Sequence, residues 1–201
     1  MDDRERERKR RLVIGGAAAA IIGAGAILFG LLLDGGGGST NTSELLGRGV
    51  LLQNAGQLEQ AADIYREVVS ADPSNKVAFF NLGVIDHAQG QTQEAAANYV
   101  QVLSLDPQYV PALFNLAILR AEEGDSQGAI GLYRRVIAVQ PDNAAALLNL
   151  GILLLQNGEE AEASDMIGRA VELNPGLQQS GRSGADAPTT TPADATESPT
   201  P

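Results

Sequence analysis

Apolar residues between positions 42 and 177 follow the spacing of amphipathic helices, and this pattern is interrupted at regular places. Within 76–109, Leu82 and Gly83 follow Phe79 by three and four positions, and in a second group Ala95, Tyr99 and Val102 are spaced by four and then three positions. Such spacing places these side chains on one face of each of two helices. The pattern predicts a pair of helices joined by a short turn, and related patterns flank it on both sides.

Four columns of residues recur every 34 positions and define the repeating unit. The columns are Gly56, Gly90, Gly124 and Gly158; Ala61, Ala95, Ala129 and Ala163; Tyr65, Tyr99, Tyr133 and Ile167; and Pro73, Pro107, Pro141 and Pro175. The glycine tolerates a positive φ in the turn between the helices, and the proline ends the second helix because it lacks an N–H group. Four units are predicted, at 42–75, 76–109, 110–143 and 144–177.

These columns resemble the tetratricopeptide repeat family, whose unit has a large residue, Leu-Gly, a small residue and a late proline. The matching residues are Phe79, Leu82-Gly83, Ala95 and Pro107; Leu113, Leu116-Ala117, Ala129 and Pro141; and Leu147, Leu150-Gly151, Ala163 and Pro175. In the first unit Arg48 replaces the leucine, as expected of a terminal repeat whose outer face meets water. The resemblance implies an all-α fold, a right-handed solenoid of four helical hairpins.

The amino-terminal part predicts a membrane anchor. A basic segment, 1–11, precedes 22 residues without charged or polar side chains at 12–33, and a Gly-rich linker follows at 34–41. A helix of that length spans about 33 Å, enough for a hydrocarbon layer of about 30 Å. The alternative is a cleaved signal peptide with a site at Ala24-Gly25-Ala26, but further apolar sequence follows that site. A single uncleaved transmembrane helix is therefore the favoured interpretation.

Basic residues set the expected orientation of this span. Six Lys or Arg residues precede it, and within about 15 residues after it only Arg48 is basic. The prediction is a cytoplasmic amino terminus with the repeats outside the cytoplasm. Gly15, Ala19 and Gly23 lie four apart on one face of the span, so it could form homo-oligomers, although Gly and Ala are also common in membrane helices generally.

Composition removes several classes of function. The net charge of −11 argues against nucleic acid as a partner, and the absence of cysteine excludes disulfides and thiolate chemistry. We find no nucleophile-base set, phosphate loop or metal cluster, so we expect no enzyme, no cofactor and no metal. The Thr-, Pro- and Ala-rich tail, 178–201, has almost no apolar content and is predicted to be disordered.

In the tetratricopeptide family the first helices of successive units line the concave surface, where peptides bind. The residues of this chain that match such a groove are Asn81, Asn115 and Asn149, the apolar Phe80, Phe114, Leu148, Val84, Ile118 and Ile152, and His87. An amide carries both a donor and an acceptor, so an asparagine ladder suits a peptide backbone of any sequence. Equally, the asparagines could orient neighbouring helices, with the apolar column partly buried.

The pattern as a whole predicts a binding protein. The leading hypothesis is a membrane-tethered scaffold or adaptor that holds peptide segments of envelope or secretory-pathway proteins. The groove lacks a cationic cluster, which favours neutral or apolar peptides over acidic chain ends. The alternative hypothesis is a homo-oligomeric structural module of a membrane complex.

Overall fold

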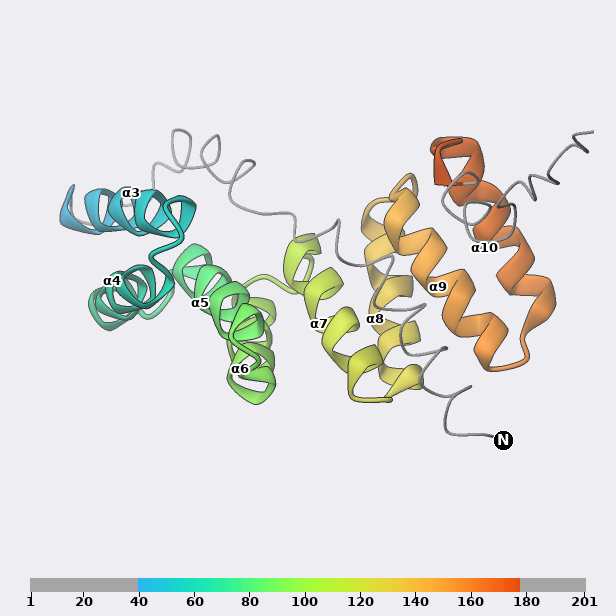
Figure 1. Ribbon diagram of the computed structural model, residues 1–201, viewed down its shortest axis with the longest axis horizontal. Coiled ribbons are helices and arrows are strands. Elements are labelled where there is room, and N and C mark those ends of the chain that lie inside the picture. The colour runs from blue at the N-terminus through green and yellow to red at the C-terminus, as the bar shows by residue number, and fades with distance from the viewer. Residues whose placement is uncertain (1–39, 178–201) are drawn as a thin grey trace, which may run out of the picture.

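The computed structural model describes residues 40–177, which form eight helices and no strand. The helices are α3 (Thr40–Asn54), α4 (Leu58–Ala71), α5 (Lys76–Ala88), α6 (Thr92–Leu105), α7 (Val110–Glu122), α8 (Ser126–Val139), α9 (Ala144–Gln156) and α10 (Glu160–Leu173). Figure 1 shows them following one another in chain order from one end of an elongated array to the other. The predicted all-α solenoid of helical hairpins is confirmed.

The predicted basic segment, membrane span and carboxy-terminal tail lie outside the described residues, as does most of the linker. The first helix, α3, begins at Thr40 and therefore includes the last two residues of the predicted linker range. Between residues 40 and 177, none of the helices combines the length and the apolar character that crossing a membrane requires.

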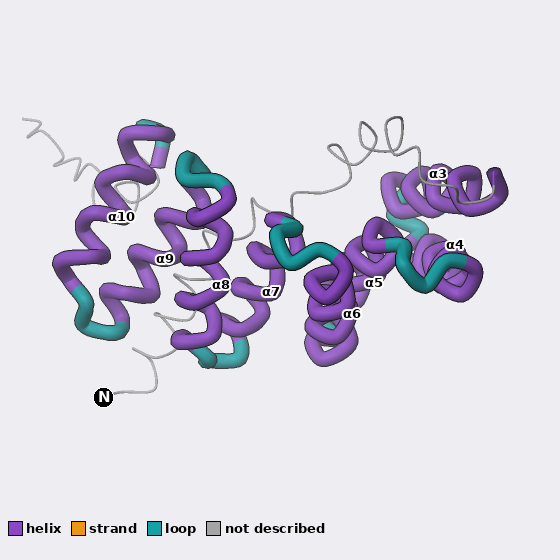
Figure 2. Tube along the Cα trace, turned by 180° about the vertical axis from the view of Figure 1, so that it is seen from behind, coloured by secondary structure: helices purple, strands orange, loops and turns teal. Residues whose placement is uncertain are grey.

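Short loops join successive helices at alternating ends (Figure 2). Inside each hairpin the loop contains the predicted glycine, and Gly56, Gly90, Gly124 and Gly158 have φ values of +74°, +76°, +84° and +84°. A side chain at these positions would meet no neighbouring atom, so the glycine is required by its backbone conformation alone. The sequence prediction for these turns is confirmed.

Between hairpins, polar side chains at the helix ends hold the loops. Asp72 and Asp106 follow α4 and α6, and their Oδ1 atoms accept the backbone N–H groups of Ser74 and Gln108 at 3.0 and 3.1 Å. Asn75 then begins α5, because its side chain accepts the N–H of Ala78. The cap from Asn75 satisfies a donor that the start of a helix otherwise leaves unpaired, and the two aspartates satisfy donors in the loops.

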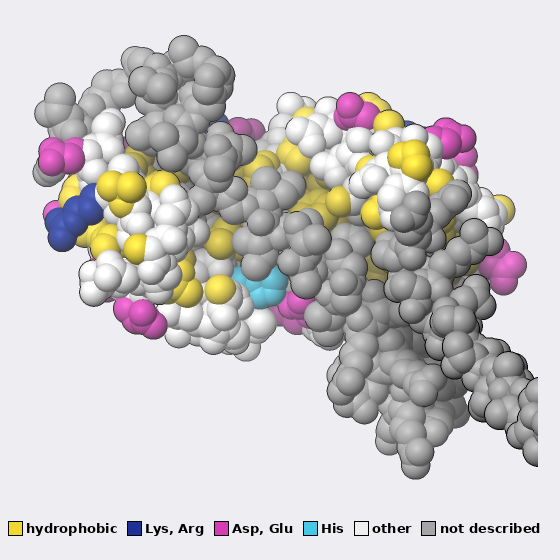
Figure 3. Space-filling view, turned by 45° about the horizontal axis from the view of Figure 1, so that its top comes forward, with side chains coloured by type: hydrophobic (Ala, Val, Ile, Leu, Met, Phe, Trp, Pro, Cys, Tyr) yellow, Lys and Arg dark blue, Asp and Glu magenta, His cyan; other side chains and the backbone are white. Residues whose placement is uncertain are grey.

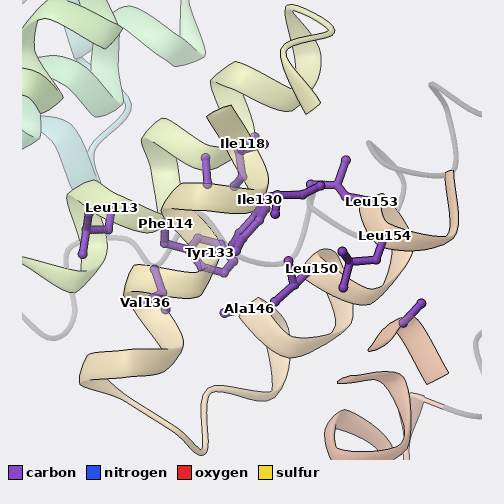
Figure 4. Packing of buried hydrophobic residues seen from close by; sticks show 13 residues of the cluster. Leu113, Phe114, Ile118, Ile130, Tyr133, Val136, Ala146, Leu150, Leu153 and Leu154 are labelled. Carbon is purple, nitrogen blue, oxygen red and sulfur yellow. The ribbon is translucent and has the colours of Figure 1, made fainter. Parts of the chain in front are cut away.

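The core is a series of apolar clusters, each formed by consecutive hairpins. Tyr65 and Tyr99 are fully buried, and their rings lie against glycines on the first helices. A Cβ atom on Gly83 would lie 2.7 Å from Cε1 of Tyr99, so this position permits close packing only without a side chain. In the third unit Ala117 stands in place of this glycine, and Figure 4 shows Tyr133 in the cluster between α7, α8 and α9, with Phe114 and Leu150.

Candidate functional site

Two of the three predicted groove asparagines connect neighbouring units. Asn115 on α7 donates a hydrogen bond to the hydroxyl of Tyr99 on α6 at 3.3 Å, and Asn149 on α9 donates to that of Tyr133 on α8 at 3.1 Å. Burial raises the pKa of both tyrosines, so their hydroxyls stay protonated. These contacts match the interpretation in which the asparagines orient helices, whereas backbone binding by the ladder stays a prediction.

Asn81, the first member of the column, has no such bond. It is 1% exposed, and its amide nitrogen has no hydrogen-bond partner among the described residues. The tyrosine that corresponds to Tyr99 is Tyr65, which donates its hydroxyl to Gln53 on α3 at 3.0 Å. In the next two units, His87 and Ala121 occupy the position of Gln53. Asn81, Asn115 and Asn149 are therefore the same residue in three units but do not make the same contacts.

The predicted apolar column is mostly core. Phe80 and Phe114 are each 1% exposed, and Phe114 makes an edge-on contact with the ring of Tyr133 at 5.5 Å between centroids. Val84 and Ile118 are also buried. Only the members in the fourth unit, Leu148 and Ile152 on α9, are half-buried. These two are the apolar members of the predicted set that offer the most surface to a ligand.

His87 lies half-buried on α5 and contacts the next first helix. Its Nε2 atom is 3.1 Å from Oε2 of Glu122 on α7, and the two side chains are 22% and 28% exposed. The neighbouring Asp86 is buried, accepts the amide of Asn98 at 2.7 Å, and has a pKa raised by that burial. Among the described residues no group of three or more His, Cys, Asp or Glu is arranged to hold a metal.

Two columns of partly accessible side chains on the first helices form what we call the first-helix surface, which consists of Gln53, Val77, His87, Pro111, Ala121, Ala145 and Leu155. The most exposed of them is Leu155, at 47%. Figure 3 shows hydrophobic side chains across the middle of the face it displays, with a histidine among them and acidic groups mainly toward the edges.

Cations do not gather on the first helices that the structure describes. Arg48 is exposed on α3, at the amino-terminal end of the array. Lys76 pairs with Asp106 at 3.0 Å. Arg120 pairs with Glu123, the residue directly after its own helix. The surface is therefore largely uncharged, apart from the contact of His87 with Glu122.

Sequence models of one repeat family match the chain in three places. A tetratricopeptide repeat model matches residues 45–75, a TPR repeat model matches 85–124, and a second tetratricopeptide repeat model matches 120–180. The chain belongs to the tetratricopeptide repeat family. No sequence among the curated proteins matched it.

Solved structures share the fold of this tetratricopeptide repeat protein. A crystal structure of MamA aligns with a TM-score of 0.63 and 22% identity, covering 69% of this chain and 81% of MamA. MamA from Desulfovibrio magneticus RS-1, residues 41 to the end, aligns at 0.60 with 17% identity, covering 67% and 76%. A tetratricopeptide repeat protein from Parabacteroides merdae ATCC 43184 aligns at 0.62 with 26% identity, covering 67% and 54%.

Sequence reasoning missed a second connection between the units of this tetratricopeptide repeat protein. Arg135 on α8 donates to the carbonyl oxygen of Pro107 at 2.8 Å, and Arg169 on α10 donates to that of Pro141 at 3.1 Å. The two arginines stand 34 residues apart, as do the two prolines. The shared spacing was therefore a visible signal. Gln101 occupies the corresponding position in the second unit.

Proposed function

We propose that this protein is a membrane-tethered scaffold whose first-helix surface holds a segment of a partner protein. The tetratricopeptide repeat fold itself supports a role in protein–protein interaction. The observation that carries the finer proposal is the row of half-buried, mostly uncharged side chains that recurs on successive first helices, as in Val77, Pro111 and Ala145. A repeating apolar row fits an extended or helical peptide better than a compact small molecule.

The proposed partner segment is neutral or apolar. Binding an acidic chain end requires converging Lys or Arg side chains, and the basic residues of the described first helices are either paired or at the end of the array. The His87–Glu122 contact offers one polar point in the row, where both side chains are partly accessible. We infer that it positions a polar group of the partner.

The proposed location of the repeats is outside the cytoplasm, where they would meet envelope or secretory-pathway proteins. The support is the apolar stretch 12–33 and the cluster of basic residues that precedes it. Protease added outside intact cells or spheroplasts should then degrade the repeats. If the protease has access to the outer face of the membrane and the repeats are still fully protected, this orientation is contradicted.

Site-specific photocrosslinking tests the peptide site. A photoreactive amino acid placed at Ala121, which is half-buried on the first-helix surface, should crosslink the partner in native membranes. The matched control is Ala138 on α8, which is exposed on a second helix. Mass spectrometry of the adducts identifies the partner and the segment held.

The proposal also predicts how capture is lost. Ala121→Arg and Ala145→Arg add bulk and charge to the row and should abolish the adduct, whereas Ala138→Arg should leave it unchanged. Circular dichroism confirms that the variants fold. Equal adducts at positions 121 and 138, or capture that survives both row substitutions, would place the binding site elsewhere.

Self-assembly is the second candidate function. It is favoured by the apolar side chains left partly uncovered in the fourth unit, such as Leu148 and Ile152. Light scattering of the purified protein separates the two candidates. A monomer that crosslinks another protein supports the scaffold, and a stable oligomer without a partner supports assembly.

A further inference from the structure

Each interior junction repeats one packing arrangement. The first helix of a unit lays three side chains, spaced four and then three residues apart, on the hairpin before it. These side chains are Ala78, Leu82 and Ile85; Ala112, Leu116 and Leu119; and Ala146, Leu150 and Leu153, and all of them are at most 5% exposed. At all three junctions the same kind of element therefore covers the carboxy-terminal side of a hairpin. It is an amphipathic helix with a small residue followed by two large apolar ones.

The last hairpin lacks this cover among the described residues. Leu148 and Ile152 on α9 are half-buried, whereas their counterparts Phe114 and Ile118 are buried under α9. On α10, Ile167 and Val171 are half-buried and Ser164 is exposed, although its counterpart Ile130 is only 2% exposed. Leu148, Ile152, Ser164, Ile167 and Val171 form what we call the C-terminal face.

The sequence that follows does not carry the pattern of such a covering helix. In phase with Ala146, Leu150 and Leu153, the chain carries Ser180, Gly184 and Ala187, and Pro188 comes directly afterwards. These residues offer little apolar area, and glycine and proline oppose a helix. The pattern that covers the first three hairpins is therefore absent from the tail.

A second copy stacked end to end, with its α3 against the C-terminal face, fits that face poorly. Its exposed amino-terminal helix, α3, carries Glu44 and Arg48 where the interior first helices carry alanine and leucine. Only Leu51, which is 71% exposed, keeps the apolar character of its column. Stacking two copies end to end would bury a carboxylate and a guanidinium against apolar side chains, and burying an unmatched charge is costly.

Charge defines the partner more closely. Residues 144–177 contain five acidic residues and one basic residue, Arg169, which donates to the carbonyl of Pro141. Glu160 is exposed near the start of α10, at the position that Leu58, Thr92 and Ser126 occupy in the other units. Complementary charge steers association and disfavours partners of like charge.

We infer that the C-terminal face binds an amphipathic helix of another protein, with an apolar seam and basic flanks. The seam carries a small residue and then two large apolar residues, four and seven positions later, as in the interior first helices. At the position of Asn115 and Asn149 the partner carries an apolar residue. The reason is that this partner residue would contact Ile167, which stands in the column of Tyr99 and Tyr133 and offers no hydroxyl to an asparagine.

Two synthetic peptides serve as probes. Both carry the sequence of α7, Val110–Glu122, with Asn115→Leu and a helix-stabilising side-chain staple, and they differ only in having Lys or Glu at the solvent-facing positions. Fluorescence anisotropy measures their binding to the full-length protein in mild detergent. The Lys peptide should bind at least about tenfold more tightly than the Glu peptide, which corresponds to about 1.4 kcal/mol.

Three variants locate the binding site of the probe. Ser164→Arg places a long charged side chain on the C-terminal face and should remove binding, and its exposed position leaves the fold intact. Glu160→Lys should reduce or reverse the preference for the Lys peptide. Val139→Arg is the control, because Val139 is 39% exposed on α8 and lies in a column that is exposed in every unit.

Several outcomes would overturn the inference. Equal binding of both peptides, or binding that survives Ser164→Arg, would exclude the C-terminal face as a charge-selective site. An oligomer that Ser164→Arg dissociates would assign the face to a second copy. Binding that appears only after removal of residues 1–39 would assign it to the chain's own amino-terminal segment. Crosslinking at Ala121 is unaffected by Ser164→Arg, so the two proposals fail separately.

Discussion

The first junction between repeats and the two later ones contain the same asparagine and tyrosine columns but are held together differently. At the later junctions Asn115 and Asn149 each bond to a tyrosine hydroxyl. Arg135 and Arg169 additionally bond to proline carbonyls there. Neither connection occurs at the first junction within the described residues, where the side chains of Glu59 and Gln89 meet at 3.3 Å. Sequence identity in a column therefore does not guarantee an identical contact.

The difference has an energetic meaning because a solenoid is nearly one-dimensional. Its stability is approximately a sum of the stabilities of the units and of the interfaces between neighbours. An end unit with a weaker interface opens before the rest. We therefore expect the hairpin α3–α4 to open first in hydrogen exchange, and the following substitutions test that expectation.

Removing a core tyrosine should have the largest effect. Tyr99 and Tyr65 are both fully buried, so Tyr99→Ala and Tyr65→Ala should each cost about 3 to 5 kcal/mol locally. Tyr99→Ala disrupts the array between its second and third units and should lower the stability of all of it. Tyr65→Ala should unfold only α3–α4, giving two transitions in denaturant. Hydrogen exchange in increasing denaturant locates the helices that unfold in each transition. A single transition in both variants would show that the first hairpin is as firmly coupled as the others.

Replacing the asparagines by leucine should give effects of opposite kind. Asn115→Leu leaves the buried hydroxyl of Tyr99 without its donor and should destabilise the protein by about 1 to 3 kcal/mol. Asn81→Leu removes an amide nitrogen that has no partner among the described residues, so it should be neutral or stabilising. Urea titration measures both variants. Equal losses would mean that Asn81 has a bonded partner in solution.

Adding the missing arginine should strengthen the first junction. Gln101→Arg supplies the donor that Arg135 and Arg169 provide elsewhere, directed at the carbonyl of Pro73. We expect a gain of about 0.5 kcal/mol, as for other exposed charged contacts, and slower exchange in α3–α4. The reverse change, Arg135→Gln, is the control and should cost a similar amount at the second junction. If the reverse change costs nothing, these bonds do not contribute to coupling.

The pH dependence of the first junction should be the smallest effect. Burial raises the pKa of Asp86, and the bond from Asn98 and the charge of Arg66 on α4 oppose that rise. A raised pKa means that the charged carboxylate costs stability at neutral pH and that this cost disappears as pH falls below the ordinary aspartate pKa of about 4. The unfolding free energy of the wild type relative to Asp86→Asn should therefore increase on acidification.

Asp72→Asn gives the opposite sign and controls for general acid effects. Hydrogen bonding to Ser74 lowers the pKa of Asp72, so its contribution is present above the ordinary pKa and is lost as pH falls. Relative to Asp72→Asn, the wild type should lose stability on acidification. If the difference in unfolding free energy changes with pH in the same direction for Asp86→Asn and Asp72→Asn, the predicted effect of Asp86 is contradicted.

Much of this fold could be predicted from spacing alone, because the demands on the turns are local. A glycine with positive φ and a proline after each second helix follow from the backbone. The roles of Phe80 and Asn81 could not be predicted in the same way. Adjacent helical positions differ by about 100° in direction, so a small rotation of the helix decides which of them is covered by the next unit. Nor does the sequence reveal that Tyr65 bonds to Gln53, since His87 and Ala121 occupy the position of Gln53 in the next two units.

The charged residues on the outer side of α3 also limit how such a gene can lengthen. Duplicating residues 76–109 or 110–143 in phase would recreate an apolar first helix at the new junction, so the product could fold with one more hairpin. Duplicating 42–75 would instead place a second Glu44 and Arg48 inside the array, where water no longer reaches them. Longer descendants of this chain are therefore expected to arise by duplication of its interior units and to keep the first repeat unit, 42–75, as a single copy.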